Sequence, residues 1–151
     1  MDKSERKVID DIDRCGWHVV KVMEDQEHPP HAFSIGLYKT FRHPEIIIVG
    51  LKLEMMHNVI NSIGADVKDG KVYESGKYYP GLLEKFDCWF NNVPCSLYED
   101  YVGYAVWYYK QSSFPLLQCV WPTTQGIYPW ELSYPRDLIQ RQPVLGEPFI
   151  I

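Results

Sequence analysis

The chain has 151 residues, of which 46 % are hydrophobic and 23 % are charged, and its formal net charge is −5. This size and composition predict one globular domain over residues 1–151, and the negative charge excludes phosphate-backbone binding as the main activity, so no nucleic-acid partner is expected. The longest purely aliphatic run, Ile46 to Val49, is too short to cross a bilayer, and the charged N-terminus lacks the apolar stretch of a signal peptide. We therefore expect a cytoplasmic protein without a membrane partner.

The start of the chain predicts a helix over residues 2–15. Asp2 and Glu5 have the D-x-x-E spacing of a capping box, and Gly16 stands where a glycine commonly ends a helix. The helix is followed by three segments that predict strands: 17–23, 32–38 and 45–51. The third is almost continuously apolar, which is typical of a central strand covered on both faces.

The second half of the chain predicts two helices and two strands. Their expected ranges are 52–66 (helix), 85–94 (strand, with a turn at Asn91-Asn92), 97–110 (helix) and 114–122 (strand). In the first of these helices Met55, Met56, Val59, Ile60 and Ile63 form one apolar face. Ser96 and Glu99 have the S-x-x-E spacing of a capping box for the second.

A proline-rich tail, residues 133–151, should be mostly extended, with one helical turn after Pro135. Consecutive strands early in the chain favour hairpins over crossover connections. The predicted fold class is therefore α+β: a single domain with a mixed or mostly antiparallel sheet, packed by about three helices.

None of the highly specific catalytic or nucleotide-binding motifs is present, so we predict no catalytic residue and no cofactor. The four cysteines, Cys15, Cys88, Cys95 and Cys119, lack the spacing of a zinc site and are expected to be free thiols, mostly buried. His28 and His31 flank a Pro-Pro pair, but no third ligand has a suitable spacing, and no metal site is predicted.

His43 and Glu45 stand at the start of the predicted central strand. Two residues apart in an extended chain, they point to the same side and could orient a general base. The alternative is structural: Glu45 would accept backbone N–H groups from a neighbouring turn and fix the loop that contains Pro44. The structural interpretation is favoured, because a histidine close to an acid is common in proteins.

A second group of candidates lies near the end of the chain: Gln118, Trp121, Trp130 and Glu131. Two indoles could form the walls of a groove, and an amide and an acid could supply its hydrogen-bonding groups. Equally, the two tryptophans could cap the core while the proline-rich tail wraps the surface. Both interpretations remain open at this point.

Four segments in fixed order carry a resemblance to a known family: "GWHVV" (16–20), "FSIGL" (33–37), "HPEIIIVGL" (43–51) and "LQCVWPTTQGIYPWE" (117–131). Over about residues 14–132 the chain resembles the bacterial family named domain of unknown function 4262. The resemblance implies a small, single-domain cytoplasmic protein; proteins of this kind sometimes occur beside secreted toxins. The chain departs from the family pattern at Thr123, where an acid is usual, and at Phe33, where a tyrosine is usual. Gly36 and Gly50 are expected inside strands, where they allow close approach.

Two hypotheses for the function follow. The preferred one is a cytoplasmic protein-binding domain, specifically an immunity-type inhibitor of a toxin, based on the net charge, the 15 % of aromatic residues and the lack of catalytic motifs. This hypothesis predicts a contact surface that is acidic and aromatic. The alternative is a small-molecule-binding or hydrolase-like protein whose cleft contains the binding candidates His43, Glu45, Gln118, Trp121, Trp130 and Glu131. Geometry separates the two, because the alternative requires these six side chains to line one pocket.

Overall fold

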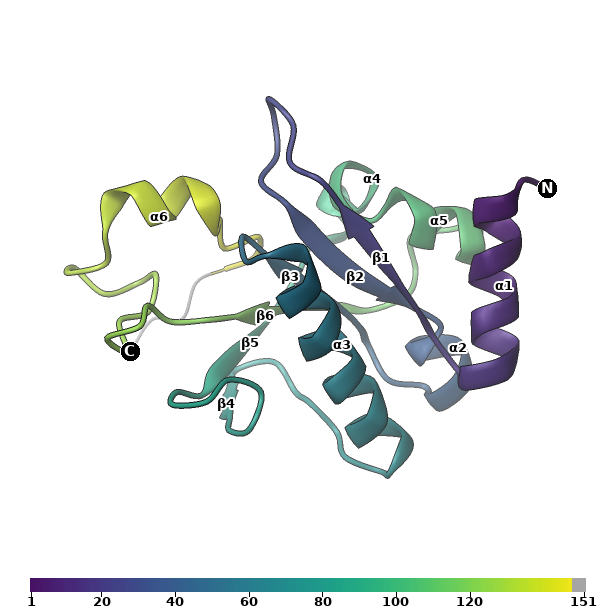
Figure 1. Ribbon diagram of the computed structural model, residues 1–151, viewed down its shortest axis with the longest axis horizontal. Coiled ribbons are helices and arrows are strands. Elements are labelled where there is room, and N and C mark those ends of the chain that lie inside the picture. Colours follow the sequence, from purple (N-terminus) through teal and green to yellow (C-terminus); the bar gives the residue numbers. More distant parts are fainter. Residues whose placement is uncertain (148–151) are drawn as a thin grey trace.

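The computed structural model describes residues 1–147 and has one six-stranded sheet with helices on both faces (Figure 1). In chain order the elements are α1 (Lys3–Cys15), β1 (His18–Val22), β2 (His31–Ile35), α2 (Leu37–Phe41), β3 (Glu45–Val49), α3 (Leu53–Lys68), β4 (Lys77–Tyr79), β5 (Cys88–Asn92), the 3-10 turn η1 (Cys95–Leu97), α4 (Tyr98–Tyr101), α5 (Gly103–Tyr109), β6 (Leu116–Val120) and α6 (Arg136–Arg141). The last four residues of the predicted tail, 148–151, lie outside the described residues.

The strand order in the sheet is β1-β2-β3-β6-β5-β4. The central pair, β3 and β6, is parallel, and every other neighbouring pair is antiparallel. The predicted α+β class with a mixed, mostly antiparallel sheet is therefore confirmed. Residues 1–147 contain six α-helices, which is roughly consistent with the expected packing by about three, since α2, α4, α5 and α6 have seven residues or fewer.

The core has two halves, one on each face of the sheet. All five residues of β3 are buried, which confirms the predicted central strand. Ile46 and Ile48 contribute to the half that contains the apolar face of α3. Ile47 and Val49 contribute to the other half, which α1, α4 and α5 complete. Because successive side chains of a strand point to opposite faces, a strand covered on both sides needs the continuous apolar run found here.

The first helix has the predicted ends. The Asp2 side chain accepts the Glu5 N–H and the Glu5 side chain accepts the Asp2 N–H, so the capping box is formed, and Gly16 closes the helix in the left-handed conformation. The predicted turn after Pro135 is also present as α6.

The strand predicted over 32–38 is shorter than expected. It ends at Ile35, and Gly36, with a φ of 118°, turns the chain into α2. A Cβ on Gly36 would stand 2.6 Å from the Gly16 carbonyl oxygen. Gly50, with a φ of 95°, lies against the Arg141 backbone and also follows its strand. Both glycines allow close approach of backbone, but at the ends of strands rather than inside them.

The helix predicted over 97–110 is divided at Val102, whose φ and ψ are −131° and 42°. Gly103 follows directly, and a glycine inside a helix costs about 1 kcal/mol relative to alanine. The Ser96–Glu99 capping box is not formed, since Ser96 lies inside the turn η1 that follows Pro94. The turn expected at Asn91-Asn92 is likewise wrong, because both residues belong to β5.

Trp17 connects the end of α1 to α3. Its Nε1–H donates to Asn61 Oδ1 at 3.0 Å, and its ring covers Gly64, where a Cβ would overlap the indole. Gly64 is buried in the apolar face of α3. The absence of a side chain at this position lets the indole lie directly on the helix backbone.

We predict that Gly64→Ala lowers the free energy of unfolding by about 1–2 kcal/mol, since overpacking against a rigid ring outweighs the gain in helix propensity. Urea unfolding followed by circular dichroism measures the change. Ser62→Ala, at an exposed position of the same helix, is the matched control and should leave stability unchanged or slightly higher. A Gly64→Ala variant as stable as the wild type would contradict the packing argument.

Candidate functional site

Glu45 is completely buried at the start of β3 and its carboxyl group is surrounded by donors. Two hydroxyls and three backbone N–H groups donate to it: Ser34 Oγ (2.6 Å), Tyr109 OH, and the N–H groups of Gly36 (2.8 Å), Leu37 (3.2 Å) and Tyr38 (3.4 Å). Burial raises the pKa of Glu45 above its ordinary value, although the bonds from Ser34 and Tyr109 oppose this shift. Accepting the N–H groups of the following turn is what the structural interpretation of Glu45 expects.

His43 is also buried, with 4 % of its surface exposed. Its Nδ1 lies 2.8 Å from the Pro44 carbonyl oxygen, and its Nε2 accepts the Tyr73 N–H at 2.9 Å. One ring nitrogen therefore donates and the other accepts, which corresponds to a neutral imidazole. Burial lowers the pKa of His43, in agreement with that state. Neither ring nitrogen bonds to Glu45, so the two residues do not form an acid–histidine pair.

Gln118 and Trp121 hold the segment that follows α6. The Gln118 amide donates to the Pro143 carbonyl at 2.9 Å and accepts the Leu145 N–H at 2.8 Å. The Trp121 indole N–H donates to the Val49 carbonyl at 2.7 Å. Both side chains are thus engaged with backbone groups inside the domain.

Trp130 and Glu131 lie in another region, next to Tyr128. The Trp130 ring stacks on Tyr128 at 5.4 Å and meets Trp89 edge-on at 5.6 Å. The Glu131 carboxylate accepts the Tyr128 N–H at 2.6 Å. The six candidates from the sequence therefore contact different parts of the chain and are not brought together around one cleft; a binding role for them stays a prediction.

One of the six, Trp121, does line a hollow. An apolar cleft of about 720 Å³ lies where the parallel strands β3 and β6 end, and its lining includes Leu51, Met55, Leu83, Phe86 and Leu138.

The apolar face predicted for α3 is wrong at one position, because Met55 is 45 % exposed. The other four predicted residues of that face are buried.

A second hollow, of about 670 Å³, follows β1 at the edge of the sheet. β1 lies between α1, which covers one face of the sheet, and α3, which covers the other (Figure 1). We call this hollow the β1 groove. It is lined by Lys7, Asp11, Arg14, Cys15, Trp17, His18, Val19, Lys21, His57, Asn61 and Lys68.

The register of the sheet fixes which backbone groups of β1 face the groove. The Gly50 N–H donates to the Pro30 carbonyl, so Pro30 directs its backbone groups toward β3 and the next residue, His31, directs them toward β1. His31 is paired with Val22, so Val22 directs its backbone groups toward β2. Backbone direction alternates along a strand, so the N–H and C=O groups of Val19 and Lys21 point away from β2, to the open side of β1. Within residues 1–147 no hydrogen bond reaches these outward groups.

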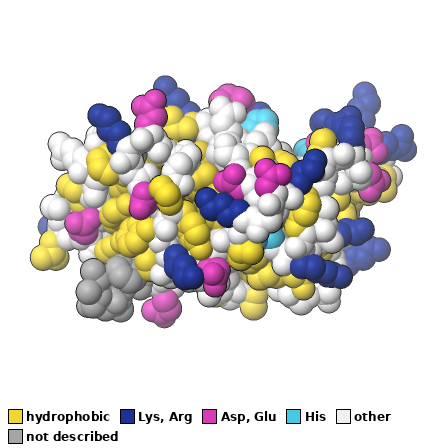
Figure 2. Space-filling view, turned by 90° about the horizontal axis from the view of Figure 1, so that it is seen from below, with side chains coloured by type: hydrophobic (Ala, Val, Ile, Leu, Met, Phe, Trp, Pro, Cys, Tyr) yellow, Lys and Arg dark blue, Asp and Glu magenta, His cyan; other side chains and the backbone are white. Residues whose placement is uncertain are grey.

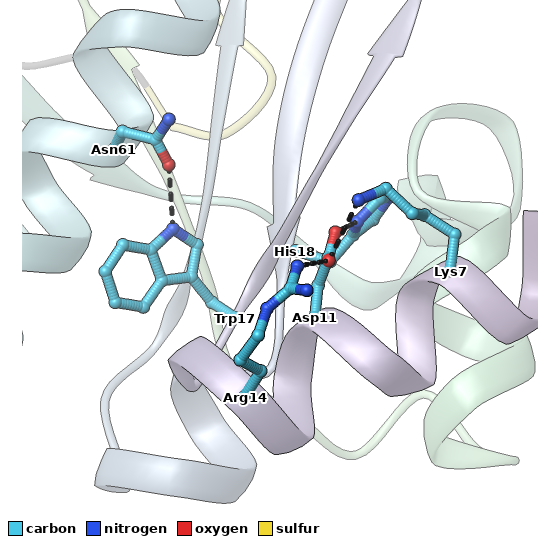
Figure 3. A network of polar contacts seen from close by, with 6 residues as sticks. All are labelled: Lys7, Asp11, Arg14, Trp17, His18 and Asn61. Atoms are coloured by element: carbon cyan, nitrogen blue, oxygen red, sulfur yellow. Dashed lines mark hydrogen bonds and ion pairs between the residues drawn. The ribbon is translucent and has the colours of Figure 1, made fainter.

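Polar side chains from α1 are ordered around Asp11 (Figure 3). The Asp11 carboxylate accepts from Lys7 Nζ (3.0 Å) and Arg14 (2.9 Å), and its other oxygen lies 2.6 Å from His18 Nδ1. Burial alone would raise the pKa of Asp11, but the bonds from His18 and Lys7 outweigh it and lower the pKa below its ordinary value. Asp11 therefore stays ionised and fixes three basic side chains at the rim of the β1 groove.

The sequence analysis did not select these residues. Lys7, Asp11 and Arg14 are spaced i, i+4, i+7, so a polar stripe on the predicted helix was available as a signal. This polar stripe does not indicate that the strand following the helix lies at the edge of the sheet. Edge position depends on pairing between distant strands, which local periodicity does not contain.

No group of three metal-ligating side chains occurs in the part of the chain that the structure describes. His31 Nε2 lies 2.8 Å from the Tyr101 carbonyl oxygen, and His28 lies 3.6 Å from Asp25. All four cysteines are free; Cys88 and Cys119 are buried, whereas Cys15 and Cys95 are exposed. None of the helices formed by residues 1–147 has the length and apolar character required to span a bilayer.

The fold and the β1 groove define a small α+β domain with an open strand edge between two helices. A family model described as "Domain of unknown function (DUF4262)" matches residues 11–135, and the chain belongs to this family. No curated protein and no solved structure matches the chain.

The departure at Thr123 has a local explanation. Its hydroxyl oxygen accepts the N–H groups of Gln125 (3.2 Å) and Ile127 (3.1 Å), which closes the turn after β6. An aspartate carboxylate can form the same kind of turn, so threonine keeps the turn without the charge. Phe33, the other departure, is buried in the core half that contains α1, where a hydroxyl would need a partner.

We predict that Glu45→Gln lowers the free energy of unfolding by about 3 kcal/mol, because the amide NH2 group meets donors in a buried site. Chemical denaturation at neutral pH measures the loss. Tyr109→Phe removes one of the donors and keeps the carboxylate, so its loss should be smaller, about 1–2 kcal/mol. If Glu45→Gln were as stable as the wild type, the carboxyl group would not be holding this turn.

Proposed function

We propose that this chain is a protein-binding domain that receives an extended segment of its partner along the open edge of β1. The observation that carries the proposal is the pair of outward-facing residues, Val19 and Lys21, whose backbone N–H and C=O groups have no hydrogen-bond partner within residues 1–147. A partner strand placed there would continue the sheet, and main-chain hydrogen bonds would supply affinity.

The two edges of the sheet differ. The opposite edge, β4, has three residues, which is short for pairing with another chain. β1 has five residues and a groove between two helices beside it. The length of β1 and its accessible backbone groups make it, rather than β4, the edge on which a strand of another protein could pair.

Within the class of protein-binding domains, the specific role that we propose is an immunity-type inhibitor of a toxin in the cytoplasm. Two things support it: the resemblance to proteins that occur beside secreted toxins, and the lack of a catalytic arrangement among the candidates from the sequence. The proposed contact surface differs from the acidic, aromatic one that the sequence suggested, because most of the charged side chains that line the β1 groove are cationic.

A second candidate function is the binding of a small amphipathic molecule in the apolar cleft beside Trp121. The volume of the cleft is in the range of ligand pockets, and its position at the ends of two parallel strands is a common one for ligands. A hydrolase-like activity has no such support, since His43 and Glu45 are engaged elsewhere.

The small-molecule candidate is tested by thermal shift with a panel of amphipathic compounds. We expect a binding compound to raise the melting temperature of the wild type and to have no effect on Met55→Trp, which places an indole in the cleft. Val72→Trp, at an exposed position outside the cleft, is the control. The candidate fails when no compound gives a shift, or when the shift persists in Met55→Trp.

The docking proposal is tested with two substitutions of one residue. Lys21→Pro removes an outward N–H but no bond of the β1–β2 ladder, whereas Lys21→Ala removes the same side chain and keeps the N–H. We expect the wild type to recover a stoichiometric protein from its native host, Lys21→Ala to reduce recovery by at most about fivefold, and Lys21→Pro by more than about tenfold.

Thermal unfolding of the three proteins confirms that each is folded before recovery is compared. A captured toxin should lose its activity when mixed with one equivalent of the wild type. Equal recovery by Lys21→Pro and Lys21→Ala, or recovery of no partner by the wild type, would overturn the proposal.

A further inference from the structure

We infer that the partner segment bound along β1 is an acidic strand, with carboxylates able to point to both sides of the sheet; this inference rests on the proposed function and names the chemistry of its partner. It follows from the distribution of charge around the β1 groove. The groove is lined by four cationic side chains, those of Lys7, Arg14, Lys21 and Lys68, and by one carboxylate, that of Asp11.

These cations are accessible. The exposed fractions of the Lys7, Arg14 and Lys21 side chains are 63 %, 68 % and 37 %, and Lys68 is exposed. Asp11 is shared between Lys7 and Arg14, and Lys21 pairs with Glu54, whereas Lys68 makes no ion pair within residues 1–147, so four cations face two carboxylates. The groove is therefore positively charged, although the chain as a whole has a net charge of −5. Figure 2 shows Lys and Arg side chains frequent at the end of the molecule where α1 lies.

The cations lie on both sides of the edge strand. His18 points toward α1, where it contacts Asp11, and Lys21 points toward α3, where it contacts Glu54 at 2.9 Å. A strand added to β1 would alternate in the same way. Its side chains on one face would meet Lys7 and Arg14, and those on the other face would meet Lys21 and Lys68. Acidic residues at successive positions would thus each find a cation.

A basic groove could also attract nucleic acid, and the structure favours a protein strand for two reasons. The outward groups of Val19 and Lys21 match the backbone of a polypeptide, which a sugar-phosphate chain does not supply. In addition, the acidic remainder of the chain would repel an extended polyanion, while a short strand would stay within the groove.

The inference is tested by fluorescence anisotropy with a labelled peptide in which glutamates occupy successive positions between valines, so that carboxylates point to both faces of the added strand. Two matched peptides accompany it: one with lysine in place of glutamate, and one with N-methyl groups on successive residues, so that neither edge has N–H donors. We expect the glutamate peptide to bind at low salt, the lysine peptide not to bind, and the N-methylated peptide to bind at least about tenfold more weakly.

Variants of the groove give opposite expected changes. Lys68→Gln should weaken binding of the glutamate peptide about threefold to fivefold, and Asp11→Asn should strengthen it, because it removes the one carboxylate of the lining. Lys39→Gln, at an exposed lysine outside the groove, is the control and should have no effect.

Each remaining outcome has a defined meaning. Tighter binding of a single-stranded oligonucleotide than of the glutamate peptide would overturn the acidic-strand inference. A different result would overturn the inference and leave the proposed function intact. In that case no acidic peptide would bind the wild type, while Lys21→Pro would still abolish recovery of the native partner. Equal binding of the N-methylated peptide, together with equal recovery by Lys21→Pro and Lys21→Ala, would overturn both.

Discussion

The buried carboxyl group of Glu45 is the constraint on which the arrangement of this domain depends. It joins the end of β2, the start of α2, the start of β3 and the end of α5 through five donors. Burial of an acid without partners would cost several kcal/mol, and here every donor around it compensates part of that cost. The same contacts allow the chain to leave β2 at Gly36 and to return as β3 within ten residues.

The position of β2 in turn determines what the edge of the sheet presents. With β2 fixed against β3, the regular register directs alternate backbone groups of β2 toward β1. A shift of one residue would exchange the inward and outward groups of β1 and would also turn its buried side chains to the wrong face. The outward direction of Val19 and Lys21 therefore follows from the core of the protein, and the β1 groove is part of the fold itself.

The sequence predicted local features well, because they depend on neighbouring residues. The capping box of Asp2 and Glu5, the covered strand that begins at Glu45 and most of the apolar face of α3 all have the predicted form. What could not be predicted is the insertion of β6 between β3 and β5, which is a pairing of distant segments. Because β6 pairs with β3 and β5 rather than with β1, β1 has only β2 as a neighbour and lies at an edge. The β1 groove was missed for this reason, whereas the search for reactive residue types selected buried groups such as His43.

The basic lining of the β1 groove disfavours the pairing of this open strand edge with a second copy of itself. Two β1 edges brought together would place Lys21 and its neighbouring cations against identical charges, and like charges in close pairs are repulsive. An acidic strand meets the same backbone groups without that repulsion. Under the proposed function, these lysines would disfavour a second copy of this chain and favour an acidic partner strand.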